Sequence, residues 1–289
     1  MNRREFTVAG LGAIAAALAA PAVSAAAGSP APGSPAAGAA DAGQPGKAGA
    51  EAKPHIAFLL YEGMTALDLI GPAAVLANGN FRVDYVWRDM NPVMTESTAD
   101  KQLALLPTAT FADIRETDVL CVPGTSNPYV QIERKDMVEW VARVGAKASW
   151  VTSVCTGSFI LGAAGLLNGY KATSHWSLVD ELAWFGAVPT PERVVRDRNR
   201  VTGAGVTSGI DFGLLLYSLM RDEGAARAQQ LLLEYDPQPP FDSGSPETAA
   251  PDLVAAVRKS YVARLQEVAP RARQSLEEAA KRLGVAAPL

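Results

Sequence analysis

The sequence predicts an α/β fold, a three-layer sandwich in which helices cover both faces of a mostly parallel central sheet. Two observations support this prediction. Nearly continuous apolar runs of strand length recur, as expected of strands buried on both faces, at 55–61, 118–122 and 149–152. Segments with the pattern of helices separate them, at 66–78, 128–145, 156–167 and 208–220. The alternation indicates one α/β domain, and we find no internal repeat.

The composition excludes several classes of protein. The chain has 289 residues, of which 48% are hydrophobic, and its formal net charge is −4. Phosphate binding needs clustered Lys and Arg, and the sequence has no dense basic patch, so we expect no nucleic-acid partner. Two cysteines are too few for a disulfide scaffold. The two histidines, His55 and His175, lie far apart, so we expect no metal and no cofactor.

The two ends of the chain have their own predicted roles. Residues 1–26 carry twin arginines, a modest apolar run and small residues near 23–26, a pattern typical of a twin-arginine signal peptide. We therefore expect a periplasmic or secreted protein without stable membrane insertion after cleavage; the alternative is a protein tethered through an uncleaved N-terminus. Residues 27–53, dominated by Ala, Gly, Pro and Ser, predict a disordered linker. The α/β domain is expected over 54–251 and a helical extension over 252–289.

The pattern that indicates chemistry surrounds Cys155. A short buried strand ends just before this cysteine and an apolar helix starts at Thr156, within a Ser-x-Cys-x-Gly frame. A nucleophile on a sharp strand-to-helix turn is held out of the sheet under strain, with its side chain exposed. The helix N-terminus also favours the thiolate and lowers the thiol pKa. The frame favours a nucleophile over a cysteine that packs as a small hydrophobe. Cys121, inside a strand, is expected in the core.

Asp68 is the candidate carboxyl group. It stands in the first turn of the helix that follows the first strand, among Leu67, Leu69 and Ile70. Two interpretations fit this position equally: a carboxyl beside the nucleophile, or an acidic residue that balances the helix dipole. Burial among the three neighbours and next to a thiolate would raise its pKa and allow acid/base work at neutral pH.

Two further pairs of residues are candidates for the pocket. Gly124 and Thr125 follow a buried strand at its carboxyl end, where open α/β sheets bind ligands, and their N–H groups are candidate oxyanion donors. His175 and Trp176 end a short strand after the Cys155 helix. His175 either orients a group near Cys155 or is a structural histidine with a satisfied hydrogen bond, and we favour the second interpretation.

These motifs resemble those of the ThiJ/PfpI superfamily, and in particular its bacterial isonitrile hydratases. The resemblance runs from about residue 55 to about residue 258. It rests on the motifs Thr65–Pro72, Leu105–Asp113, Val151–Ser158, Leu161–Leu167, Ala172–Trp176, Arg193–Asp197 and Glu234–Pro240. The Cys155 motif is shared by the superfamily and by related transcription regulators, whereas Asp68 and Glu234–Pro240 point more narrowly to the hydratases. The resemblance implies a flavodoxin-like, class I glutamine-amidotransferase-like fold.

The resemblance also implies a function. The implied protein is a cofactor-free lyase, which adds water to an isonitrile and gives an N-substituted formamide through a covalent cysteine thioimidate. By resemblance Cys155 is the nucleophile, Asp68 replaces the glutamate of other members, and Thr156 positions water or substrate. A homodimer with its active sites near the interface is implied as well. Family members often carry Gly-Gly where this chain has Gly124-Thr125, so we expect a reshaped pocket.

Two other functions fit the same sequence. A glyoxalase or deglycase acting on α-oxoaldehydes would consume methylglyoxal and no isonitrile. A cysteine-based redox or ligand sensor would oxidise readily to the sulfinic acid and turn over no carbon substrate. Regulators that contain this domain add a helix-turn-helix domain, and residues 252–289 are too short and too mixed in charge for one.

Overall fold

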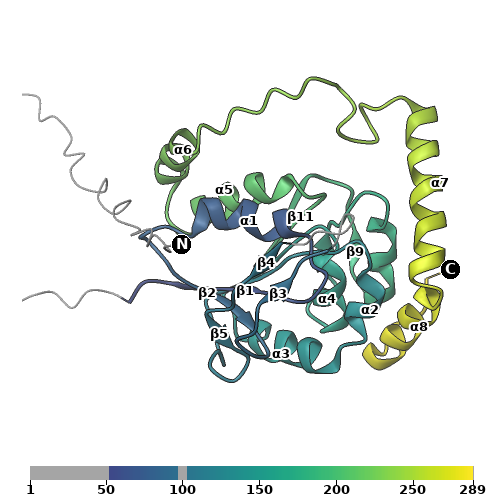
Figure 1. The fold of residues 1–289 in the computed structure, drawn as a ribbon, viewed down its shortest axis with the longest axis horizontal. Helices are drawn as coiled ribbons and strands as arrows, with labels where there is room; N and C mark the ends of the chain where they lie inside the picture. The colour runs from purple at the N-terminus through teal and green to yellow at the C-terminus, as the bar shows by residue number, and fades with distance from the viewer. Residues whose placement is uncertain (1–51, 97–102, 289) are drawn as a thin grey trace, which may run out of the picture. The chain divides into compact units, whose positions relative to one another are not determined.

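The computed structural model describes residues 52–96 and 103–288, so the predicted signal peptide and nearly all of the predicted linker lie outside the described residues. The α/β prediction is confirmed: helices cover both faces of a seven-stranded sheet (Figure 1). Every neighbouring pair in this sheet is parallel except the hairpin of β10 and β11 at one edge. The order is β10 (Val194–Asp197), β11 (Arg200–Gly203), β7 (Trp150–Val154), β6 (Val119–Val122), β1 (His55–Leu59), β2 (Arg82–Trp87) and β5 (Ala109–Thr110).

The central strands explain where the site lies. β1 and β6 are apolar and buried throughout, because helices pack on both of their faces. Phe58 of β1 pairs with Cys121 of β6, which pairs with Thr152 of β7. This parallel register brings the carboxyl ends of the three strands to one edge of the sheet, where the segments that follow them meet.

The helices form two layers. α1 (Ala66–Leu76) and α5 (Ser208–Met220) pack together on one face of the sheet, and α6 (Glu223–Leu232) follows α5. The other face carries α2 (Pro128–Ile132), α3 (Lys135–Gly145), α4 (Gly157–Ala163) and a 3₁₀ helix at Val179–Phe185. The segment 128–145, expected as one helix, is thus two. Two small pairs complete the elements: antiparallel β3 (Val93–Met94) with β4 (Ala104–Leu105), and parallel β8 (Lys171–Ala172) with β9 (Val188–Pro189).

The C-terminal part of the described chain contains two separate helices. After α6 an irregular strap, residues 233–250, arches over the α1 and α5 layer and leads to α7 (Pro251–Val268) and α8 (Ala272–Leu283) (Figure 1). The break between α7 and α8 contains Pro270, which lacks an N–H donor and disfavours helix at the residue before it. In the described part of the chain no helix combines the length and the hydropathy that a membrane span requires.

Candidate active site

The segment between β7 and α4 forms a strained elbow at Cys155. Its backbone φ is +56°, a left-handed conformation that is uncommon for a residue with a side chain and costs about 1–3 kcal/mol. The elbow is held on both sides. The Cys155 N–H is shared by the carbonyls of Gly203 and Ala204, at 3.0 and 2.8 Å. The Cys155 carbonyl accepts from the hydroxyls of Ser158 and Ser174, at 3.1 and 3.2 Å.

Gly157 lets the chain turn at this elbow. A Cβ at Gly157 would overlap the carbonyl oxygen of Val122 and lie 2.7 Å from that of Pro123, and both are backbone atoms that cannot move aside. We expect Gly157→Ala to lower the free energy of unfolding by about 1–3 kcal/mol, the usual cost of overpacking, as measured by urea denaturation. Gly79, with open space where its Cβ would be, is the matched control. Equal stability of the two variants would contradict this account.

The Cys155 thiol is more enclosed than the sequence suggested. Only 6% of the residue is exposed. Burial raises the pKa of the thiol well above its ordinary value, and the charge of Asp68 raises it further, while a hydrogen bond from the Thr156 N–H opposes these effects. The expectation of an exposed side chain with a lowered pKa is therefore wrong, because desolvation outweighs the helix N-terminus. The resting form of Cys155 is the neutral thiol.

Asp68 is buried beside this thiol. Its Oδ2 accepts from the Gly124 N–H at 2.9 Å, whereas Oδ1 has no hydrogen-bond partner among the described residues. Burial, and secondarily the charge of Glu96, raise the pKa of Asp68 to about 7, against hydrogen bonds from Gly124 and Cys155. Of the neighbours expected to bury it, Leu67 and Ile70 are 43% and 41% exposed. Asp68 is enclosed instead because its face of α1 points toward the loop after β6.

The loop Gly124–Ser126 connects the parts of the site through three successive backbone N–H groups. They donate, in order, to Asp68 Oδ2 at 2.9 Å, to Thr156 Oγ1 at 2.8 Å and to a Glu96 carboxylate oxygen at 3.1 Å. Gly124 must be glycine here, since a Cβ would lie 2.6 Å from the Thr156 nitrogen and 2.8 Å from Asp68 Oδ2. The prediction that the Gly124 and Thr125 N–H groups are free oxyanion donors is wrong, because both already hold site side chains.

Thr156 ties this loop to the elbow. Its hydroxyl donates to the Thr125 carbonyl at 2.6 Å and accepts from the Thr125 N–H, and only 1% of the residue is exposed. The proton of this hydroxyl is therefore committed to the protein and is not available to a water or a substrate. The contact that Thr156 makes with the thiol comes from its backbone N–H.

His175 and Trp176 lie next to the elbow. The structure shows no hydrogen bond from either side chain to the Cys155 thiol. The Nδ1 of His175 is 2.7 Å from the Ser177 hydroxyl, and burial lowers the pKa of the ring, which is neutral at pH 7. Its ring centroid lies 5.7 Å from that of Trp176 and 5.8 Å from that of Tyr261 on α7. This satisfied geometry agrees with the structural interpretation of His175.

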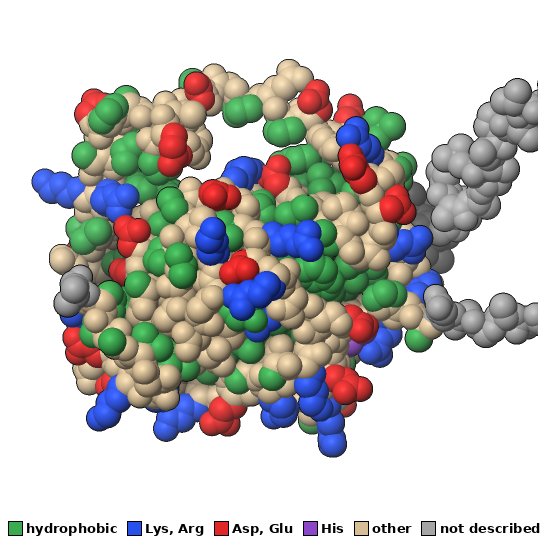
Figure 2. Space-filling view, turned by 180° about the vertical axis from the view of Figure 1, so that it is seen from behind, with side chains coloured by type: hydrophobic (Ala, Val, Ile, Leu, Met, Phe, Trp, Pro, Cys, Tyr) green, Lys and Arg blue, Asp and Glu red, His purple; other side chains and the backbone are tan. Residues whose placement is uncertain are grey.

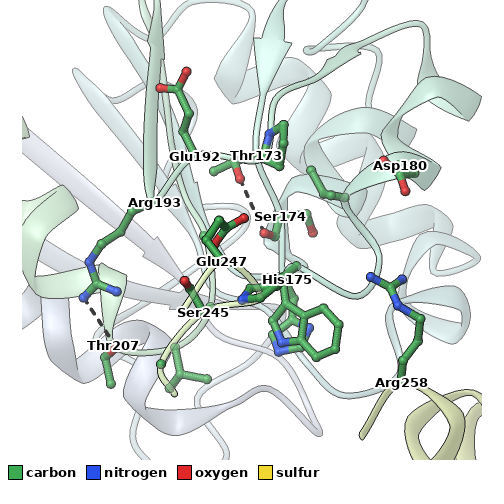
Figure 3. A pocket seen from close by; sticks show the side chains of 18 residues that line it. Thr173, Ser174, His175, Asp180, Glu192, Arg193, Thr207, Ser245, Glu247 and Arg258 are labelled. Carbon is green, nitrogen blue, oxygen red and sulfur yellow. Dashed lines mark hydrogen bonds between the residues drawn. The ribbon is translucent and has the colours of Figure 1, made fainter. Parts of the chain in front are cut away.

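A cavity of about 610 Å³ lies on one side of His175 (Figure 3). Ser174, which bonds the Cys155 carbonyl, lines it, together with the loop 204–207 and residues 244–247 of the strap. Arg193 and Arg258 stand at opposite sides of the cavity (Figure 3). Cys155 itself does not line it, so the cavity adjoins the elbow and does not contain the thiol.

Sequence reasoning missed three residues of the site. The charge of Glu96 adds to the effect of burial in raising the pKa of both Asp68 and Cys155. Tyr261, whose pKa is raised mainly by burial, lies against the His175 ring. Tyr61, fully buried, donates to the Pro123 carbonyl at 2.7 Å. Only Tyr61 carried a signal, since it is the last residue of the apolar run 55–61, which ends at the ligand-binding edge. Among the residues described here, no cluster of three or more His, Cys, Asp or Glu is suited to a metal ion.

The fold and the site define a class of protein: an α/β protein with a mostly parallel sheet, a cysteine on a strained strand-to-helix turn and a buried carboxyl group beside its thiol. A family model described as "DJ-1/PfpI family" matches residues 54–219, and this chain belongs to that family, which is also called ThiJ/PfpI. The chain is 48% identical to isonitrile hydratase of Pseudomonas putida over 71% of this chain and 88% of the relative. It is 36% identical to an uncharacterized protein of Streptomyces lividans, over 46% of this chain and 95% of that protein.

Solved structures show the same fold. A ThiJ/PfpI family protein from Pseudomonas syringae superposes with a TM-score of 0.69 and 44% sequence identity, covering 79% of this chain and 90% of the other. Drosophila melanogaster DJ-1beta has a TM-score of 0.56 at 18% identity, which shows the shared fold alone. The regulator CdhR of Pseudomonas aeruginosa is 27% identical, and the aligned region spans 52% of its length.

Proposed function

We propose that this protein is an isonitrile hydratase, which adds water to the terminal carbon of an isonitrile and releases an N-substituted formamide. One observation supports this most: the Cys155 thiol and the Asp68 carboxyl are buried together, and Asp68 Oδ1 has no hydrogen-bond partner among the described residues. The likeness to the Pseudomonas putida hydratase supports the same choice.

The first step forms a bond between Cys155 Sγ and the terminal carbon of the isonitrile. With a pKa of about 7, Asp68 is near half-protonated at neutral pH, so it can donate its proton to that carbon as the C–S bond forms. The thiol proton passes to the carboxylate, and Asp68 is ready for the next step. The product is a thioimidate, in which the former isonitrile carbon carries one hydrogen, the sulfur and a double bond to nitrogen.

The second step hydrolyses this thioimidate. As water adds to the carbon, the protonated Asp68 gives its proton to the nitrogen and takes one proton from the water. Collapse of the tetrahedral intermediate breaks the C–S bond, forms the carbonyl group of the formamide and returns the proton to the sulfur. Overall one isonitrile and one water give one formamide, and no electrons are exchanged with another molecule.

The remaining site residues act by holding this pair in place. Thr156 joins the elbow to the Gly124–Ser126 loop, and the same loop orients Asp68 through the Gly124 N–H. We therefore assign Thr156 as a positioning residue. The protein supplies binding, orientation and a buried proton donor, and all covalent chemistry passes through Cys155.

The neutral thiol also distinguishes this proposal from a redox sensor. Sensor cysteines are low-pKa, solvent-accessible thiols, whereas the pKa of Cys155 is raised by burial and only 6% of the residue is exposed. Such a thiol resists chance oxidation and reacts when a bound electrophile and a proton acceptor are both present.

The test is incubation of the purified protein with a simple aryl isonitrile, following the formamide by absorbance, with methylglyoxal as the competing substrate. Formamide formation without consumption of methylglyoxal is expected. Consumption of methylglyoxal alone would move the protein to the deglycase-like alternative. Turnover of neither, with ready sulfinic acid formation at Cys155, would favour the sensor.

The resemblance to the family also led us to expect a homodimer, and the surface of the α1 layer supports that proposal. Leu67 and Ile70 are partly exposed, beside a groove that Leu105 and Leu106 help to line. Figure 2 shows hydrophobic side chains gathered on the face beneath the strap. Because Asp68 lies on the same helix, an interface here would place two sites near each other.

We expect light scattering after size-exclusion chromatography to give the mass of two chains, and Ile70→Glu to give the mass of one, since a charge placed in an apolar interface must be desolvated. Val257, 45% exposed on α7, provides the control Val257→Glu, which should stay dimeric. A wild-type protein with the mass of one chain at micromolar concentration would contradict the dimer.

A further inference from the structure

Helix α7 contacts the rest of the molecule mainly at the loops of the candidate site. Of its 18 residues only Leu265 is buried, so it lacks the apolar face that normally anchors a helix. The Arg258 guanidinium lies 4.9 Å from the ring centroid of Trp176, and the Asn127 side-chain amide donates to the Val268 carbonyl at 3.0 Å. α7 also lies outside the residues that the family model matches, 54–219.

Tyr261 of α7 contacts both loops of this region. It is partly buried, its ring lies 5.8 Å from the His175 ring, tilted by 34°, and its hydroxyl is 3.5 Å from the Ser126 carbonyl oxygen. Ser126 closes the loop that holds Asp68. His175 follows Ser174, whose hydroxyl bonds the Cys155 carbonyl. Tyr261 thus bridges the two loops on either side of the elbow.

Hydrogen bonds tie both of these loops to the elbow: the Ser174 hydroxyl donates to the Cys155 carbonyl, and Thr125, next to Ser126, is bonded to Thr156, the residue after Cys155. Burial between these loops raises the pKa of Tyr261 to about 12, so its hydroxyl is neutral at pH 7. The Cys155 residue is only 6% exposed, so any group that covers the remaining opening decides what reaches its sulfur. An aromatic ring held between two site loops is well suited to that task, because it is rigid and presents a large apolar surface.

We infer that Tyr261 is a specificity-determining residue, whose ring forms the outer wall of the Cys155 site and limits the size of the group that reaches the thiol. The inference deepens the proposed function and rests on the same site. It makes α7 a part of the substrate pocket, with the organic substituent of the isonitrile lying against the Tyr261 ring while its terminal carbon lies at Cys155 Sγ.

The test uses two alkylating reagents of different size on the full-length protein, iodoacetamide and the bulkier N-ethylmaleimide. Labelling reports on Cys155 because Cys121 is fully buried and its pKa is raised to about 12, and Cys155→Ala gives the background. We expect Tyr261→Ala to speed labelling by N-ethylmaleimide roughly tenfold, the scale on which pockets discriminate apolar groups, and labelling by iodoacetamide much less. Tyr261→Phe, which keeps the ring, should label like the wild type.

Two further variants exclude a general loosening of the fold. Val262→Ala changes the next residue of α7, 45% exposed, and should leave both rates unchanged. Tyr261→Trp enlarges the ring and should shift the ratio of the two rates opposite to Tyr261→Ala. Unchanged rates in Tyr261→Ala, or a shift in the same direction for Ala and Trp, would overturn the inference.

Turnover gives a second readout. With isonitriles as substrates, Tyr261→Ala should raise kcat/KM for a bulky aryl isonitrile relative to a small alkyl one, mainly through KM. An unaltered ratio of kcat/KM between the two substrates would count against the inference. If no variant hydrates isonitriles but the labelling ratio shifts as expected, the proposed function fails and the assignment of Tyr261 stands.

Discussion

Replacing Cys155 with alanine is expected to reduce the kcat for isonitrile hydration by at least about 10³-fold, because the covalent route is lost and the remaining groups only bind and orient the substrate. Formamide formation, followed by absorbance at saturating isonitrile, measures the loss. Circular dichroism and urea denaturation should show a folded protein, since the substitution removes a single sulfur from a site that is not part of a continuous strand.

The second cysteine offers a matched control. Cys121 lies in β6, fully buried in the core, at the centre of the sheet. Cys121→Ala should keep most of the turnover and lose stability by about 1 kcal/mol, the typical effect of a core substitution. Normal turnover by Cys155→Ala would remove the nucleophile from the account, and equal losses in both variants would point to a general structural effect.

Replacing Asp68 with asparagine is expected to lower kcat by about 10²- to 10⁴-fold, the usual contribution of a positioned acid or base. The substitution preserves shape, and the asparagine oxygen can still accept from the Gly124 N–H. In the wild type, kcat/KM should fall as the pH rises through about 7, because the protonated form of Asp68 supplies the proton to the isonitrile carbon. The variant should lack this inflection.

Stability should change with pH in the same direction. The pKa of Asp68 is raised from 3.8 to about 7 on folding, so the folded state binds the proton more tightly than the unfolded state. This contribution to stability is fully present below pH 4 and is lost as the pH rises toward 7. Asp68→Asn removes that dependence, so the variant should gain stability relative to the wild type between pH 4 and pH 8 in urea denaturation. An Asp68→Asn protein with full activity would remove the acid/base assignment and leave Cys155 untouched.

Much of the fold could be predicted because it depends on local patterns. The apolar runs of β1, β6 and β7 lie where the sequence indicated, since strands buried on both faces have few alternatives. The Cys155 thiol and the Asp68 carboxyl also lie together, as one of the two equally weighted interpretations of Asp68 required. Cys155 directly follows β7, and Asp68 lies in the first turn of the helix that comes after β1; both strands end at one edge of the sheet.

The electrostatics of the site could not be predicted in the same way. The helix N-terminus at Cys155 is a local feature, and it favours a thiolate. The burial that raises the thiol pKa depends on distant segments, among them the loop that carries Gly124 and the segment that carries Glu96. Likewise the Thr125 N–H looked free in the sequence, and only the folded chain shows that Thr156 accepts from it. The sequence separates Tyr261 from Cys155 by more than 100 residues and has no pattern that joins them.

The most direct test of the central claim is the mass of the protein during turnover. Because Asp68 takes part in both the formation and the hydrolysis of the thioimidate, the wild-type protein itself is mixed with a saturating aryl isonitrile, quenched in acid during turnover and analysed by intact-protein and peptide mass spectrometry. The account predicts a mass increase equal to one whole isonitrile, located on the peptide that contains Cys155 and absent after Cys155→Ala. Formamide production by the wild type with no adduct on Cys155, and with turnover retained in Cys155→Ala, would contradict it.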